Sequence, residues 1–136
     1  MKPISDLTEL LRSMQPVLND GAYYFVTLPE NCDLPLTDTV ATIREREGLS
    51  VVIGEEIALV RGLQNDFRAA WITLNAYSDL AVVGLTAAFA KALGQVGISC
   101  NVVAGNLHDH IFVPYEQADL AMQTLLALQQ NGVQAA

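Results

Sequence analysis

The fold is decided in residues 84–116, which read GLTAAFAKALGQVGISCNVVAGNLHDHIFVPYE. From Gly84 onward, apolar residues recur at the steps of three and four that are typical of an amphipathic helix, and Gly97 ends the pattern. Residues 98–104 and 110–113 are rich in β-branched residues and flank Gly105 and Asn106, which predicts a hairpin of two strands. This stretch therefore predicts a helix followed by a β-hairpin.

The same reading extends over the carboxy-terminal half of the chain. Residues 70–74 predict a strand before the helix, and apolar spacing over residues 116–129 predicts a second helix after the hairpin. Strand, helix, strand, strand, helix is the order of a split βαβ unit, an antiparallel sheet with helices on one face.

The amino-terminal half predicts a different order. A capping box at Asp6 opens a helix that Pro16 ends, so the helix precedes the strands instead of connecting the first two. In chain order, we predict a helix over 6–15, a strand over 23–28, a loop over 31–38, strands over 39–46 and 49–53, and a short helix that begins at Gly54.

We expect two related modules, residues 1–65 and 66–136, with joined sheets. VVIGEE at 51–56 and IFVPYE at 111–116 both lead from a strand into a helix that begins with acidic residues. No Pro/Gly/Ser-rich tract separates the halves, so a flexible linker is not expected.

Composition excludes several classes of protein. The 136 residues are 51% hydrophobic with a formal net charge of -8, which argues against disorder. No Lys or Arg follows Lys91, so nucleic acid and anionic membranes are unexpected partners. The longest apolar tract is too short for a membrane helix, and residues 1–6 do not resemble a signal peptide. We expect a cytoplasmic protein whose two cysteines are free thiols.

The passage from Asn75 to Gly84 is the best candidate for a ligand site. A loop between a strand and a helix leaves the first helical amides without intrahelical partners, which favours a bound carboxylate, and glycine permits close approach. Asp79 in that loop can pair with an ammonium group. The alternative is that Asp79 or Ser78 only stabilises the turn.

The sequence resembles the ACT-domain superfamily, whose βαββαβ modules bind small regulatory ligands, usually amino acids. It is more closely similar to a small bacterial family with two ACT-like domains in one chain. The resemblance is carried by GLTAAFAKAL at 84–93, GISCNVVAG at 97–105, HDHIFVP at 108–114, and IRE and EGL at 43–45 and 47–49. It implies an α+β fold of ferredoxin-like modules. It also implies a ligand site formed by Asp79, Leu80, Val83, Gly84 and Leu85, with Asn75, Ser99 and Asn101 as nearby polar candidates.

Three other clusters have competing interpretations. His108 and His110 would share one face of a strand and supply at most two ligands to a metal, so a role in fixing the hairpin is favoured over zinc binding. Cys100 with His108 could form a nucleophilic pair, but a cysteine within a strand is more often a core residue. Arg44 lies in an alternating charge run typical of an edge strand, with a carboxylate-binding role as the alternative.

The hypothesis from sequence is a non-enzymatic, amino-acid-binding regulatory protein that forms a homodimer and needs no cofactor. The alternatives are a small enzyme that uses His108 and His110, and an oligomerisation module that binds no ligand.

Overall fold

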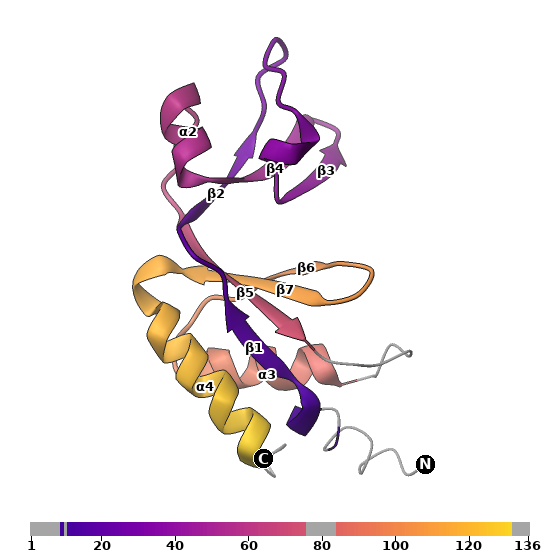
Figure 1. The fold of residues 1–136 in the computed structure, drawn as a ribbon, viewed down its shortest axis with the longest axis vertical. Helices are drawn as coiled ribbons and strands as arrows, with labels where there is room; N and C mark the ends of the chain where they lie inside the picture. Colours follow the sequence, from indigo (N-terminus) through magenta and orange to yellow (C-terminus); the bar gives the residue numbers. More distant parts are fainter. Residues whose placement is uncertain (1–8, 10, 76–83, 132–136) are drawn as a thin grey trace.

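The computed structural model describes residues 9, 11–75 and 84–131. Its strands form one antiparallel seven-stranded sheet in the order β3-β4-β2-β5-β7-β6, with β1 also paired to β5 (Figure 1). The strands are β1 Gln15–Leu18, β2 Tyr23–Thr27, β3 Ala41–Glu45, β4 Gly48–Gly54, β5 Arg68–Asn75, β6 Asn101–Ala104 and β7 Asp109–Pro114. The helices are α2 Glu55–Arg61, α3 Leu85–Gln95 and α4 Ala118–Asn131, with short 3-10 helices η1 Leu36–Asp38 and η2 Tyr115–Gln117.

Strand β5 is shared by two ferredoxin-like modules. Arg68 and Ala69 pair with β2, whereas residues 72–75 pair with β1 along the same edge of β5. The amino-terminal module therefore has the strand order β5-β2-β4-β3, and the carboxy-terminal module has β1-β5-β7-β6. In each module the fourth strand lies beside the first, as a split βαβ unit requires. The predicted fold of two joined modules is confirmed, and the join is a strand that both use.

The first strand of the chain completes the second module. Strand β1 is its fourth strand, and Leu11 and Met14 just before β1 are fully buried in its core. Of the helix predicted over residues 6–15, residues 6–8 and 10 lie outside the described residues, and Glu9 is helical. Residues 11–13 are helical, but Gln15 already belongs to β1, so the predicted end of this helix was wrong. Strand β1 was not predicted because it has only four residues and contains Pro16, which a strand paired on one side tolerates.

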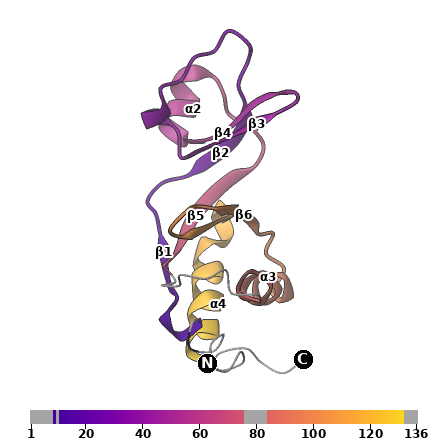
Figure 2. The ribbon, with the colours of Figure 1, turned by 90° about the vertical axis from the view of Figure 1, so that its right-hand side faces the viewer.

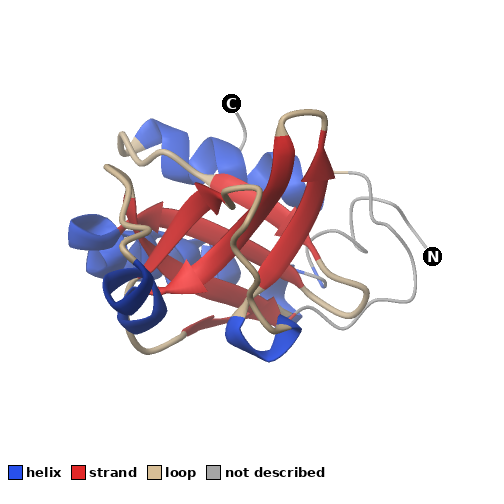
Figure 3. Ribbon diagram, turned by 90° about the horizontal axis from the view of Figure 1, so that it is seen from above, coloured by secondary structure: helices blue, strands red, loops and turns tan. Residues whose placement is uncertain are grey.

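Helices α2, α3 and α4 pack on one face of the sheet, as predicted, and none of these three described helices covers the other face, which we call the helix-free face. Helices α3 and α4 cover Ile72, Leu74 and Ile111, and α2 covers Val51 and Ile53 on the other module. Tyr24 packs with α2 and opposes Arg68, which alternates with Ala70 and Ile72 on the same face. Figure 2 shows α3 and α4 below β5 and β6, with α2 at the far end of the molecule, and Figure 3 looks along the long axis of the molecule across the twisted strands.

The helix-free face curls so that the two modules meet. The rings of Phe25 on β2 and Phe112 on β7 lie 5.1 Å apart although β5 separates their strands. Trp71 stacks on Phe112 at 6.2 Å, and Tyr23 meets Trp71 edge-on at 5.3 Å. We call Tyr23, Phe25, Phe67, Trp71 and Phe112 the aromatic seam.

The other predicted elements are confirmed with two shifts. The strand predicted over 98–104 begins only at Asn101. The residues before it connect α3 to the strand, and Ile98 in this connection is buried in the core. The helix predicted over residues 116–129 begins with the 3-10 turn η2 and continues as α4. No helix in the described part of the chain is long and apolar enough to span a membrane.

Candidate functional site

Three features meet at one end of the carboxy-terminal module (Figure 1). Strand β5 ends at Asn75, and α3 begins after Gly84. Leu74 opposes Asp109, which opposes Ala104, so the β6–β7 turn lies at the end of β5. The strand-to-helix passage selected from the sequence therefore starts and finishes at the same end of this module.

The start of α3 has the backbone that the ligand hypothesis requires. Gly84 has φ 106° and ψ -15°, a conformation that L side chains rarely adopt, and its carbonyl accepts the amide of Ala88 at 2.8 Å. Gly84 has no side chain to cap the helix, and the macrodipole of the 11-residue α3 is positive at this end. Leu85 is buried in the core, so its side chain is not available to a ligand. Asp79, Leu80 and Val83 lie outside the described residues.

Asn75 is the polar candidate that the structure places at this end. It is half-buried at the last position of β5 and opposes Gln15 of β1. Alternation along β5 puts Asn75 on the helix-free face with Trp71 and Thr73. The exposed Gln15 was missed as a neighbour because no sequence signal marked β1.

Ser99 and Asn101 lie toward the opposite end of the same module. Asn101 opposes Phe112, which opposes Trp71, four residues before Asn75 on β5. Four residues of strand correspond to about 13 Å. Asn101 is exposed, and its side-chain amide donates to the carbonyl of Phe112 at 3.5 Å. A single chain therefore does not bring these two residues together with Asn75 and Gly84.

The two histidines differ in their surroundings. His110 is half-buried in β7, and its Nδ1 accepts the indole N–H of Trp71 at 3.0 Å. Burial lowers the pKa of His110 below its usual value, and the nearby His108 lowers it further. His108 is exposed and precedes β7. Among the described residues no group of three metal-binding side chains forms.

Cys100 has the environment of a core residue. It packs against the carboxy-terminal core, and burial raises the pKa of its thiol. A raised pKa disfavours the thiolate that a nucleophile needs. Cys32 and Cys100 are not joined, as predicted.

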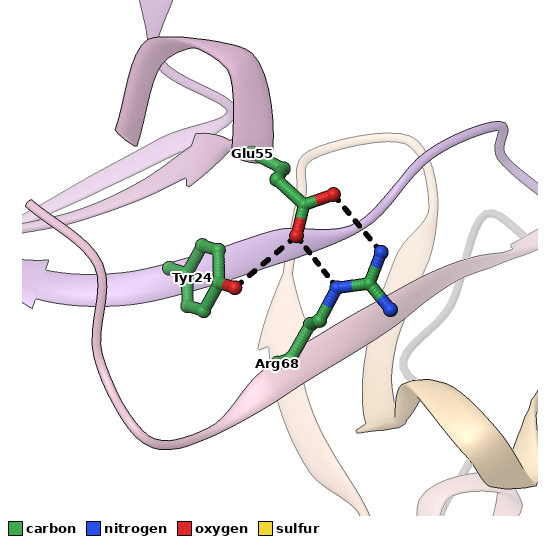
Figure 4. Close-up of polar contacts among 3 residues, drawn as sticks. All are labelled: Tyr24, Glu55 and Arg68. Atoms are coloured by element: carbon green, nitrogen blue, oxygen red, sulfur yellow. Dashed lines mark hydrogen bonds and ion pairs between the residues drawn. The ribbon is translucent and has the colours of Figure 1, made fainter. Parts of the chain in front are cut away.

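A polar cluster ties the modules together on the helix side (Figure 4). The guanidinium of Arg68 donates to both carboxylate oxygens of Glu55, at 2.6 and 2.9 Å, and the hydroxyl of Tyr24 donates to the same carboxylate at 3.2 Å. The Arg68 side-chain hydrogen bond lowers the pKa of Glu55, and Glu55 in turn raises the pKa of Arg68. Arg68 also lies 4.0 Å over the ring of Tyr115. Since both charges are already paired, the cluster is a structural contact between α2, β5 and η2.

Arg44 is exposed on β3, the edge strand of the amino-terminal module. Its neighbours across the strand pair are backbone and side-chain groups of Leu49. The prediction of a charged edge strand is confirmed.

Sequence profiles of the ACT domain match residues 2–70 and 67–127 of this chain of two ferredoxin-like modules. The chain belongs to the ACT-domain family. The resemblance drawn from the sequence is thus confirmed.

Solved structures show the same architecture. A Vibrio cholerae protein of unknown function, described as a possible transport protein, is 43% identical with a TM-score of 0.80, and the match covers 95% of this chain and 100% of that one. The ligand-free regulatory subunit of aspartate kinase from Thermus thermophilus is 9% identical with a TM-score of 0.55, over 82% and 95%. A putative regulatory domain of aspartate kinase from Porphyromonas gingivalis is 14% identical with a TM-score of 0.53, over 90% and 98%. No curated protein matches the sequence.

Proposed function

We propose that this protein is a non-enzymatic regulatory module that binds an amino acid where α3 begins. The observation that carries the proposal is that β5 ends, and α3 begins after Gly84 with its positive end, at the same end of the module (Figure 1). The family adds support, since ACT domains serve as regulatory ligand-binding modules. Two unjoined, half-buried thiols fit a reducing compartment, and we place the protein in the cytoplasm.

The chemistry of the site suits a zwitterion. The first amides of α3, beginning with that of Leu85, would bind the carboxylate, because a helix N-terminus combines N–H donors with a positive dipole. Asp79 would pair with the ammonium group. Leu80 and Val83 would line the passage between them.

Ligand binding is tested by thermal unfolding with each common amino acid in excess. A ligand at about one hundred times its dissociation constant adds roughly 2.7 kcal/mol of stability. We expect one or a few amino acids to raise the midpoint temperature. Asp79→Asn should abolish the shift, whereas Asp66→Asn, which removes an exposed carboxylate at the other end of β5, should preserve it. The proposal fails if no amino acid stabilises the protein, or if both variants respond as the parent does.

We also propose that the protein is a homodimer joined through β6. Among the described strands, β1, β3 and β6 are each paired on one side only, and β1 contains Pro16, which has no N–H to donate to a partner strand. Strand β3 carries exposed Arg44 and Glu45, and charged side chains protect edges from pairing. Strand β6 has no charged side chain, and Val102 at its centre is 40% exposed.

Pairing through β6 would bring the polar candidates of one chain towards the β6–β7 turn of the other. Antiparallel pairing of β6 with a second copy, centred on Val102, sets Ser99 opposite residue 105 of that copy, in the turn at the end of its β5. Asn101 of one chain then lies toward the end of the sheet where Asn75 and Gly84 of the other lie.

The interface is tested by Val102→Lys, which would place two ammonium groups opposite each other at the centre of the paired strands. Light scattering after gel filtration should show a dimer for the parent and a monomer for this variant. Thr42→Lys makes the matching change on exposed β3 and should leave the dimer intact. A monomeric parent, or a dimer broken only by Thr42→Lys, would refute this interface.

A further inference from the structure

A chain of hydrogen bonds crosses the helix-free face beside the aromatic seam. The side-chain amide of Asn19 donates to Thr73 Oγ1 at 3.0 Å, and Thr73 Oγ1 lies 3.1 Å from His110 Nδ1. Trp71 Nε1 donates to the same His110 nitrogen at 3.0 Å. The chain of contacts links the β1–β2 connection, β5 and β7.

The donors in this network define the protonation state of His110. An indole N–H can only donate, so Nδ1 of His110 must accept and cannot carry a proton. The amide N–H of Asn19 donates into Thr73 Oγ1, which leaves the Thr73 hydroxyl hydrogen free to point at Nδ1 as well. Neutral His110 with its proton on Nε2 is the form in which Nδ1 can accept the indole N–H.

We propose that His110 is a proton-operated latch between the modules, which holds Trp71 in the aromatic seam when neutral and releases its indole when protonated. A proton on Nδ1 would face the indole N–H at 3.0 Å, donor against donor. The imidazolium could donate only to Thr73 Oγ1. Trp71 would then lose its hydrogen-bond partner.

The ring has little room to escape this conflict by turning. It lies between Trp71, at 5.7 Å between ring centroids, and Gly105 of the hairpin turn. A Cβ at Gly105 would lie 3.1 Å from His110 Nε2 and 2.9 Å from the carbonyl oxygen of His108, so the ring packs against the turn backbone. The imidazole is therefore held in the position where protonation breaks the Trp71 bond.

The charged groups around His110 agree with a neutral ring. On its own strand, Asp109 favours the protonated form, but His108 and burial oppose it, and together they lower the pKa of His110. On β5 the facing residues are Trp71 and Thr73, and on β6 the opposing residue is Val103, none of which titrates near neutrality. Across the seam, the Tyr23 hydroxyl donates to the backbone carbonyl of Asp20.

The direction of the pH effect follows from the lowered pKa. The latch is complete above the unperturbed value of 6.5 and is lost as the pH falls through the lower pKa of the folded state. Since Trp71 also contacts Tyr23 of the amino-terminal module, loss of the latch should loosen the contact between modules in acid. Acidification would thus weaken any structural coupling between the two modules that passes through the aromatic seam.

The experiment uses Trp71 as its own reporter, because it is the single tryptophan in the chain. We would follow its indole N–H by NMR, and its exchange with solvent, as the pH is lowered. We expect one transition with a midpoint below 6.5, across which the corrected exchange rate rises about fivefold, the factor for one lost hydrogen bond of ordinary strength. His110→Asn retains an acceptor without a titrating ring and should remove the transition. His108→Asn should preserve it.

Nitrogen chemical shifts of the His110 ring in the parent protein provide a second readout that does not depend on a variant folding. At neutral pH, Nδ1 should show the shift of an unprotonated acceptor. Three results would each overturn the proposal: a protonated Nδ1 at neutral pH, an indole N–H signal that does not change as His110 titrates, or a transition that persists in His110→Asn.

Discussion

A chain that lacks residues 1–18 is expected to lose the folded carboxy-terminal module, although every residue of that half remains. The deletion removes β1 from the edge of β5 and takes Leu11 and Met14, both fully buried, out of the core beneath it. Loss of each such side chain costs about 2–5 kcal/mol, and a domain has only roughly 5–15 kcal/mol in total. The two side chains alone therefore account for most of the stability of the module.

Amide hydrogen exchange measures this loss directly. In the truncated chain, the amides of α3, α4 and β7 should lose protection. A circular permutant with residues 9–18 placed after Asn131 through a flexible Gly/Ser linker should regain it, because Gln129 near the end of α4 donates to the Arg12 carbonyl at 3.1 Å. A truncated chain with full protection would show that residues 66–136 fold as a unit, which is the division predicted from the sequence.

Phe112→Ala is expected to destabilise the whole protein by about 3–5 kcal/mol, the usual cost of truncating a buried phenylalanine. Phe112 is fully buried, and its ring contacts Phe25 from one module and Trp71 from the other. The cavity would open where the modules meet, on the face that no helix covers. A gap in this position cannot be filled by one helix moving inward.

Denaturant unfolding followed by Trp71 fluorescence provides the measurement. Leu107→Ala is the control, because Leu107 is 77% exposed in the same hairpin and its loss should change stability by no more than about 0.5 kcal/mol. A Phe112→Ala effect below about 1 kcal/mol would mean that the seam contributes little and that the modules are joined mainly by β5. Two separate transitions would lead to the same conclusion.

Local signals explain why much of the fold was predictable. The helical spacing from Leu85 and the Gly105–Asn106 turn depend on residues close in sequence, and α3 and the β6–β7 hairpin were found there. The same holds for β2 and for the β3–β4 pair around Gly48. Strand β1 was not predicted because four residues that include a proline carry no periodic signal, and because its partner strand lies more than fifty residues away in the sequence.

The candidate site was predictable only in part. The strand-to-helix passage made Gly84 and Asn75 candidates, and the structure has β5 end and α3 begin at the same end of the module as the hairpin turn. Their role in binding a ligand stays a prediction. That Ser99 and Asn101 lie at the other end depends on strand register, which one hairpin cannot reveal. The Glu55–Arg68 pair and the His110–Trp71 bond join residues from different elements, and no spacing in the sequence connects them.

By itself, the sequence determined which segments are helices and strands in the carboxy-terminal half, the ferredoxin-like class and the family, because periodicity, turn residues and motif similarity are local properties of the chain. Only the tertiary structure decided that β5 serves two modules, that β1 completes the second, and that an aromatic seam closes the helix-free face. The physical reason is that a strand needs a hydrogen-bonding partner and apolar side chains need to be buried, wherever in the sequence the partner lies. The partner of β1 is β5, more than fifty residues further along the chain.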